Sequence, residues 1–318
     1  MRQIKPINVK LDRVGIFKLI IIIFTFMNII FQVDGGIGKS ILATAVCKAI
    51  KTQYPNDNLI VITGYPEVFL CNPYVEKTFS HNNLNYFWVD FIQGKEIKMM
   101  IHNPYFETDF ILQKDHLIKV WCEMFEIKYN GELPEIFLNN REIEFFGKNF
   151  ISPKPIMVIQ SNGGAMNQLN KYSWTRDLPL SIAQNIVNYF MNDYTIFHVK
   201  REDQFPLQNT IPIQAEFRAV ATLIYLSDKR LFIDSFCQHT AAALNKKSVV
   251  CWIGNLPSQF GYELNSNIIA NQPTLKPELK NSIFSKYNLT GQPLEFCYNN
   301  EDEIFNYEKI IDELIELN

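Results

Sequence analysis

Residues that could bind an anion or accept a proton cluster in one short segment, Val33-Asp-Gly-Gly-Ile-Gly-Lys-Ser40. The segment lies between an apolar run that predicts a strand, 28–33, and a stretch with helical spacing of apolar residues, 37–52. Its glycines allow a sharp turn and a close approach of ligand to the main chain. The free N–H groups at the start of the helix would attract phosphate. The candidate residues are Asp34, Gly35, Gly36, Gly38 and Lys39.

This segment is similar to the Walker A loop of P-loop ATPases, G-x-x-x-x-G-K-[ST]. Counted back from Gly38, the first glycine of that motif falls on Val33, and ParA-like ATPases carry lysine where this chain has Asp34. An aspartate there would repel phosphate, and only Asp90 and Asp234 follow apolar runs as magnesium ligands would. A P-loop ATPase therefore stays an alternative interpretation, and so does a tight turn without a ligand.

A second segment places polar residues directly after the apolar run 231–233 and before a short helix of small residues, 238–244. Open α/β sheets bind ligands at the carboxyl ends of their strands, so the backbone N–H groups near 235–239 could hold a diphosphate. The simpler interpretation is that an aspartate or serine caps the helix and that the histidine is structural. The candidate residues are Asp234, Ser235, Gln238 and His239.

A third segment, Gln160-Ser-Asn-Gly-Gly-Ala165, also follows an apolar run, 156–160. Its glycine pair could admit a phosphate group. The stretch 171–177 that comes after it supplies two basic side chains for that charge. The candidate residues are Ser161, Gly163, Gly164, Lys171 and Arg176.

Predicted strands and helices alternate from Met27 onward, and the pattern restarts near residue 150 after the proline-containing stretch 151–155. Such alternation indicates parallel sheets with helices on both faces. We therefore predict an α/β protein with two doubly wound Rossmann-like domains, 27–150 and 151–318, that ends in an amphipathic helix. Further strands are expected at 59–63, 86–91, 97–101, 194–199 and 248–252, and further helices at 115–125, 180–190, 216–226 and 302–317.

The composition excludes some classes of function. A net charge of −3 gives no sign of the basic surface of a nucleic-acid-binding protein. The six cysteines are scattered without C-x-x-C spacing, which disfavours a zinc site and fits a reducing, cytoplasmic compartment. Residues 1–26 are basic and then apolar. We interpret them as a dispensable or peripheral extension, with a membrane-associating segment as the alternative.

Together these segments resemble glycosyltransferase family 9, the lipopolysaccharide heptosyltransferase-like enzymes of GT-B fold. Asn28–Pro55 looks like the family's opening strand, glycine turn and long helix, and Glu67–Val75 looks like its N-P-x-V segment. Leu231–Gly254 looks like the motif D-S-G-x-x-H-x-A-x-A-L-x-K-P, with Asp234, Ser235 and His239 at the matching positions. Phe236 departs from its glycine, and Ser248, which follows Lys247, departs from the proline after its lysine. The similarity covers nearly the whole chain from Met27.

The resemblance implies a glycosyltransferase that holds a nucleotide-diphosphate sugar in the second domain, with the glycan or glycolipid acceptor on the first. It implies no cofactor and no metal, and the chain has no D-x-D pair to hold one. The family's opening turn carries G-D, with the aspartate as general base, where this chain has Gly38-Lys39, so Asp34 is our substitute candidate. Lys39 could bind phosphate across the cleft. A non-catalytic remnant that binds sugar or nucleotide is a third interpretation, and the implied location is the cytoplasm or the inner face of a membrane.

Overall fold

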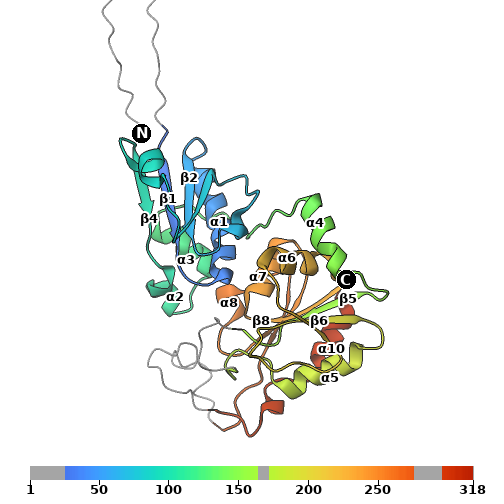
Figure 1. Ribbon diagram of the computed structural model, residues 1–318. Helices are drawn as coiled ribbons and strands as arrows, with labels where there is room; N and C mark the ends of the chain where they lie inside the picture. The colour runs from blue at the N-terminus through green and yellow to red at the C-terminus, as the bar shows by residue number, and fades with distance from the viewer. Residues whose placement is uncertain (1–25, 164–171, 276–295, 318) are drawn as a thin grey trace, which may run out of the picture.

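The computed structural model describes residues 26–163, 172–275 and 296–317 and shows two α/β domains (Figure 1). The expectations for Gly164, Lys171 and residues 1–25 lie outside the described residues. None of the helices in the described part of the chain is both long enough and apolar enough to cross a lipid bilayer.

The first domain is built on a parallel sheet with the strand order β3-β2-β1-β4. One face of this sheet is covered by the apolar side chains of α1 and α3. Within this core, Trp121 of α3 makes an edge-to-face contact with Phe31 of β1. The elements are β1 (Asn28–Val33), α1 (Ile37–Gln53), β2 (Asn58–Thr63), β3 (Lys77–Ser80), β4 (Ile97–Met100), α2 (Thr108–Ile111) and α3 (Leu117–Met124).

The other face of the first sheet is covered by one π-helical turn, Trp88–Ile92, in the part of the chain that the structure describes. The prediction of a strand at 86–91 is therefore wrong. Phe87 and Phe91 both turn inward onto Phe79, with ring centroids 5.4 and 5.7 Å away. In a strand, Phe87, Val89 and Phe91 would all point to the same face of the sheet. Val89 is instead exposed, which fits the π-helical turn and not a strand.

The second domain is a six-stranded parallel sheet with the order β10-β9-β8-β5-β6-β7. Helices α5 and α10 cover one face, and α6 and α7 cover the other (Figure 1). This domain is doubly wound, as predicted. Its strands are β5 (Ile156–Ile159), β6 (Thr195–Val199), β7 (Ile211–Ile213), β8 (Lys229–Ile233), β9 (Val249–Trp252) and β10 (Ser266–Ile269). Its helices are α5 (Leu180–Phe190), α6 (Phe217–Leu226), α7 (Phe236–Ala243), α8 (Pro257–Phe260) and α10 (Tyr307–Glu316).

The two domains share a core, because Trp252 and Phe260 of the second domain belong to the same buried cluster as α1 and α3. The chain crosses between them in an extended stretch that donates a hydrogen bond from Ile136 N to Ala243 O (3.2 Å). It then forms α4 (Asn140–Gly147), which begins with a capping box between Asn139 and Glu142.

Arg218 of α6 fastens this crossing to the second domain. Its buried guanidinium donates to both carboxylate oxygens of Glu142 (2.8 and 2.7 Å) and to the Phe137 carbonyl (2.7 Å). We expect Arg218→Ala to lower the free energy of unfolding by about 2–4 kcal/mol, because it leaves a half-buried carboxylate without its partner. Denaturant unfolding would measure this, with Arg141→Ala, an exposed arginine on α4, as the near-neutral control.

The Arg218 prediction also has a pH signature. The hydrogen bonds from Arg218 lower the pKa of Glu142. The corresponding stability is present above the ordinary glutamate pKa and is lost as the pH falls through the lowered pKa. The gap between wild type and Arg218→Ala should therefore narrow in acid, and equal stabilities at neutral pH would contradict the role of the ion pair.

Candidate active site

The second sheet has its topological switch point between β8 and β5. From β5 the chain adds β6 and β7 on one side, and then β8, β9 and β10 on the other side. Ligands of open α/β sheets bind at the carboxyl ends of such strands. The segments after β5 and β8 are those that contain Ser161, Gly163, Asp234 and Ser235. The structure thus brings the second and third predicted segments together.

Ser235 ties the two segments to each other, because its hydroxyl donates a hydrogen bond to Gln160 Oε1. Ser235 occupies the N-cap position of α7, but its side chain does not cap the helix. The capping interpretation is therefore wrong for the Ser235 hydroxyl. The N–H groups of the first turn keep their capacity to bind an anion, which the helix dipole favours.

Asp234 lies beside this turn and accepts a hydrogen bond from Asn255 Nδ2 (2.5 Å). Burial raises the pKa of the Asp234 carboxyl, while the hydrogen bond from Asn255 and the positive charge of Arg176 act in the opposite direction. Asn255 was missed by the sequence analysis, although it closely follows the predicted strand at 248–252 and could have been proposed for the same edge of the sheet. Asn255 thus fixes the position of the Asp234 carboxyl close to the switch point.

Gly163 is overlaid by the side chain of Arg176. A Cβ atom at Gly163 would lie 2.9 Å from Arg176 Nε and 3.2 Å from Cζ. The loop is held by the buried Asp177, which accepts hydrogen bonds from Gly163 N (2.9 Å) and Ser173 N (2.8 Å). Burial raises the pKa of Asp177, and these hydrogen bonds oppose that rise. Only glycine allows a guanidinium to pass this close to the turn.

Ser161 is buried, and its hydroxyl donates to Asn162 Oδ1 (2.9 Å) and lies 3.0 Å from His198 Nε2. Burial, with a smaller effect from Lys200, lowers the pKa of His198 to about 4. The Ser161 hydroxyl is therefore engaged by neighbours within the second domain, and its contact with a sugar donor stays a prediction.

Gln238 and His239 lie where α7 meets the first domain. Gln238 Nε2 donates to the Phe260 carbonyl (3.1 Å), and His239 Nδ1 lies 2.8 Å from the Tyr262 hydroxyl. A Cβ atom at Gly38 would lie 3.3 Å from the His239 ring. Burial lowers the pKa of His239 to about 3, so the imidazole is neutral. The His239 ring thus lies at the contact between the domains, while Gln238 is bonded within the second domain, and the contact of either side chain with ligand remains a prediction.

Asp34 is the exposed carboxylate of the first segment, with 55% of its side chain accessible. It follows β1, accepts a hydrogen bond from Gln32 Nε2 (3.0 Å) and lies 3.4 Å from His81 Nε2. Gly35 has a φ of +106°, in the left-handed region that favours glycine. His81, which follows β3, was missed by the sequence analysis because that edge strand was not predicted.

Lys39 is turned into the first domain. Its ammonium donates to Asn103 Oδ1 (2.8 Å) and lies 4.9 Å and 5.1 Å from the ring centroids of Tyr105 and Trp121. Burial lowers the pKa of Lys39 to about 8, against the opposite effect of Asp34. Only 5% of the residue is exposed. In this conformation Lys39 is an internal cation, not the outward lysine of a P-loop.

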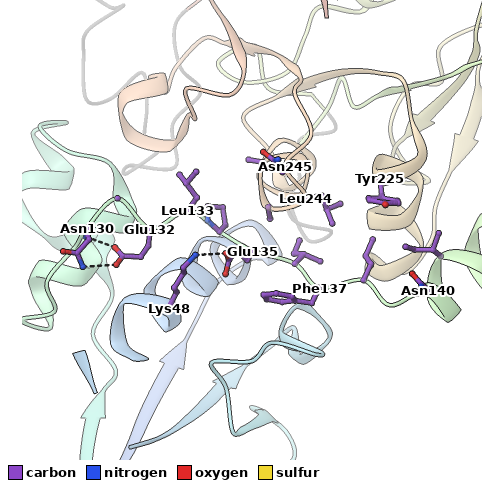
Figure 2. A pocket seen from close by; sticks show the side chains of 17 residues that line it. Lys48, Asn130, Glu132, Leu133, Glu135, Phe137, Asn140, Tyr225, Leu244 and Asn245 are labelled. Carbon is purple, nitrogen blue, oxygen red and sulfur yellow. Dashed lines mark hydrogen bonds and ion pairs between the residues drawn. The ribbon is translucent and has the colours of Figure 1, made fainter. Parts of the chain in front are cut away.

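Two further features lie apart from these loops. A cavity of about 810 Å³ follows the crossing between the domains, beside the Lys48–Glu135 ion pair (2.7 Å) and the end of α7 at Leu244 and Asn245 (Figure 2). An acidic group of the first domain, Asp109, Asp115 and Glu123, is paired with Lys114 and Lys119. Neither contains a residue that ends β1, β5 or β8.

No protein-family model and no curated protein matches the sequence. Several solved glycosyltransferases have similar structures. A glycosyl transferase family 9 protein from Veillonella parvula DSM 2008 has a TM-score of 0.65 at 11% identity, over 92% of this chain and 97% of that one. The E. coli ADP-heptose lps heptosyltransferase II has a TM-score of 0.62 at 10% identity, over 92% and 98%. The E. coli heptosyltransferase WaaC with ADP has a TM-score of 0.51 at 8% identity, over 77% and 94%.

At these identities the likeness establishes the fold. The chain has the GT-B fold, and the predicted resemblance to family 9 is confirmed at that level.

Proposed function

We propose that the chain is a glycosyltransferase, which binds a nucleotide-diphosphate sugar at the β8/β5 switch point and transfers the sugar to a hydroxyl of a glycan or glycolipid. One observation carries the proposal. The first turns of α1 and α7 meet, since a Cβ atom at Gly38 would lie 3.7 Å from Phe236 Cα. Asp34 lies four residues before Gly38, and Ser235 directly precedes Phe236, so both candidate groups are in the turns that lead into this contact between the domains.

The chemistry follows from these two groups. The acceptor oxygen attacks the anomeric carbon, its proton passes to the Asp34 carboxylate, and the bond from that carbon to the diphosphate oxygen breaks. The nucleoside diphosphate leaves with the bonding electron pair. Proton removal in the transition state is general-base catalysis. His81, 3.4 Å from Asp34, is placed to orient the carboxylate.

The growing charge on the leaving diphosphate needs fixed positive groups nearby. The first turn of α7 and the guanidinium of Arg176 over Gly163 supply them without a metal ion. Gly164 and Lys171 belong to the same proposal on sequence grounds alone. The solved structure of WaaC contains ADP, which supports a nucleoside diphosphate as the leaving group.

The buried position of Lys39 disfavours the ATPase alternative, because a P-loop lysine must reach the phosphates. The non-catalytic remnant differs from the transferase in a measurable way. It would bind nucleotide or sugar with no release of nucleoside diphosphate, even with Asp34 intact.

The proposal is tested by thermal stabilisation with ADP, UDP, GDP and CMP, with and without magnesium, and with Mg-ATP. A ligand at a hundredfold excess over its dissociation constant adds about 2.7 kcal/mol of stability. We expect one nucleoside diphosphate to raise the melting temperature without magnesium, and Lys39→Ala to preserve that shift. A shift with Mg-ATP alone that Lys39→Ala abolishes would replace the transferase by the ATPase.

A further inference from the structure

The outer face of the first sheet is covered incompletely in the part of the chain that the structure describes. Strand register places Met99 opposite Ile30, so both side chains point to this face. The π-helical turn covers Ile30 with Phe87, Phe91 and Ile92. Beyond it, on the edge strand β4, Ile97 and Met99 remain 39% and 47% exposed.

The turn that covers this face also presents apolar side chains outward. Trp88 is 64% exposed and Val89 61%, and Tyr86, two residues before the turn, is 78% exposed. The Asn28 side chain donates to the Phe91 carbonyl (2.8 Å), which fixes the turn over the start of β1. Phe26, 54% exposed, lies two residues before that point. We call the set Phe26, Tyr86, Trp88, Val89, Ile97 and Met99 the outer patch.

The chain that leads into the outer patch has a composition suited to a lipid surface. Residues 14–24 are apolar or glycine apart from Lys18, and residues 1–13 carry Arg2, Lys5, Lys10 and Arg13. About 20 apolar residues are needed to span a bilayer, so this stretch is too short to do so. Tryptophan and tyrosine are enriched at the membrane interface, and basic segments are attracted to anionic headgroups.

We propose that the outer patch docks the protein on the surface of an anionic lipid bilayer. The sequence alone pointed to residues 1–26 and gave no sign of the turn at 88–92 or of β4 as part of such a surface. In Figure 1 β4 lies on the opposite side of the first domain from α4, so docking there leaves the contact between the domains uncovered. The inference does not depend on transferase activity, because binding is measured without turnover.

The experiment uses the full chain and vesicles of phosphatidylcholine mixed with phosphatidylglycerol, compared with phosphatidylcholine alone. We expect cosedimentation with the mixed vesicles and a loss of about tenfold or more in Trp88→Ser/Val89→Ser, equal to at least about 1.4 kcal/mol. Phe145→Ser, an equally exposed aromatic on α4, is the matched control and should bind as wild type does. Circular dichroism verifies that each variant is folded.

A second readout uses the wild-type fold. Trp121 and Trp252 are fully buried and Trp174 is partly buried in the second domain, so the quenching by brominated lipid that is lost in Trp88→Phe reports on Trp88 and should be the larger part of the signal. Equal vesicle binding by the double variant and wild type would overturn the proposal. A concentration-dependent dimer that the double variant abolishes would also overturn it, because the outer patch would then bind a second copy of the chain. Stronger vesicle binding after deletion of residues 1–25 would overturn it too, because the outer patch would then bind the chain's own N-terminal segment.

Discussion

Replacing Asp34 with asparagine should reduce sugar transfer by about 10²–10⁴-fold and leave nucleoside diphosphate binding unchanged. Asparagine keeps the shape of the side chain and can still accept the hydrogen bond from Gln32, but it cannot take up the acceptor's proton. The fold should be preserved, because 55% of the Asp34 side chain is exposed. The measurement is release of nucleoside diphosphate from the donor identified by thermal stabilisation, in the presence and absence of acceptor.

Asp109→Asn is the matched control for this variant, since it also neutralises an aspartate of the first domain, one whose side chain is 46% accessible. It should leave both turnover and binding unchanged. Full turnover in Asp34→Asn would exclude Asp34 as the base. Loss of nucleotide binding along with turnover would assign Asp34 to the binding of substrate instead of to proton transfer.

The central strands of both sheets could be predicted because they are buried on two faces. Runs such as 28–33, 156–160 and 231–233 are apolar throughout, and the helices that follow show helical spacing. The strands that were missed are β3, β7 and β10, and all three lie at sheet edges. An edge strand is buried on fewer sides, so sequences such as Lys77–Ser80 lack the apolar run that identifies a strand.

In the candidate site, too, some residues could be predicted from the sequence and others could not. Asp34, Ser235 and Gly163 could be placed from sequence, because each follows a predicted strand and parallel strands end at one edge. Their partners could not. His81 reaches Asp34 only because β3 belongs to the same sheet, and Asn255 reaches Asp234 only because β9 pairs with β8. Strand order depends on the whole chain, and a local pattern does not contain it.

Lys39 illustrates why a motif needs its surroundings. The sequence Gly-Lys-Ser before a helix is typical of phosphate binding. Here the side chain has a competing environment, in which Asn103 accepts a hydrogen bond and Tyr105 and Trp121 offer their ring faces. A cation between two aromatic rings gains electrostatic stabilisation that offsets part of its burial. Residues more than 60 positions away therefore decide the direction of this lysine.

Gly163→Ala and Arg176→Ala should each weaken nucleoside diphosphate binding by about 10- to 100-fold, the loss expected for a hydrogen bond to a charged group. A Cβ atom at Gly163 would lie 2.9 Å from Arg176 Nε, so the alanine should displace the guanidinium from the turn. The flexible arginine can move away, and stability should change little. The two changes remove the same interaction, so the double variant should bind as weakly as either single one.

Titration calorimetry with the nucleoside diphosphate would measure all three dissociation constants and hence the coupling between the two positions. Gly64→Ala is the glycine control, because a Cβ atom there meets only an ordinary contact at 3.9 Å with the His81 ring. Arg141→Ala is the arginine control on the exposed face of α4. Additive losses in the double variant would show that Gly163 acts on the ligand without Arg176. Unchanged binding in Arg176→Ala would remove the guanidinium from the diphosphate site and leave the first turn of α7 as its main support.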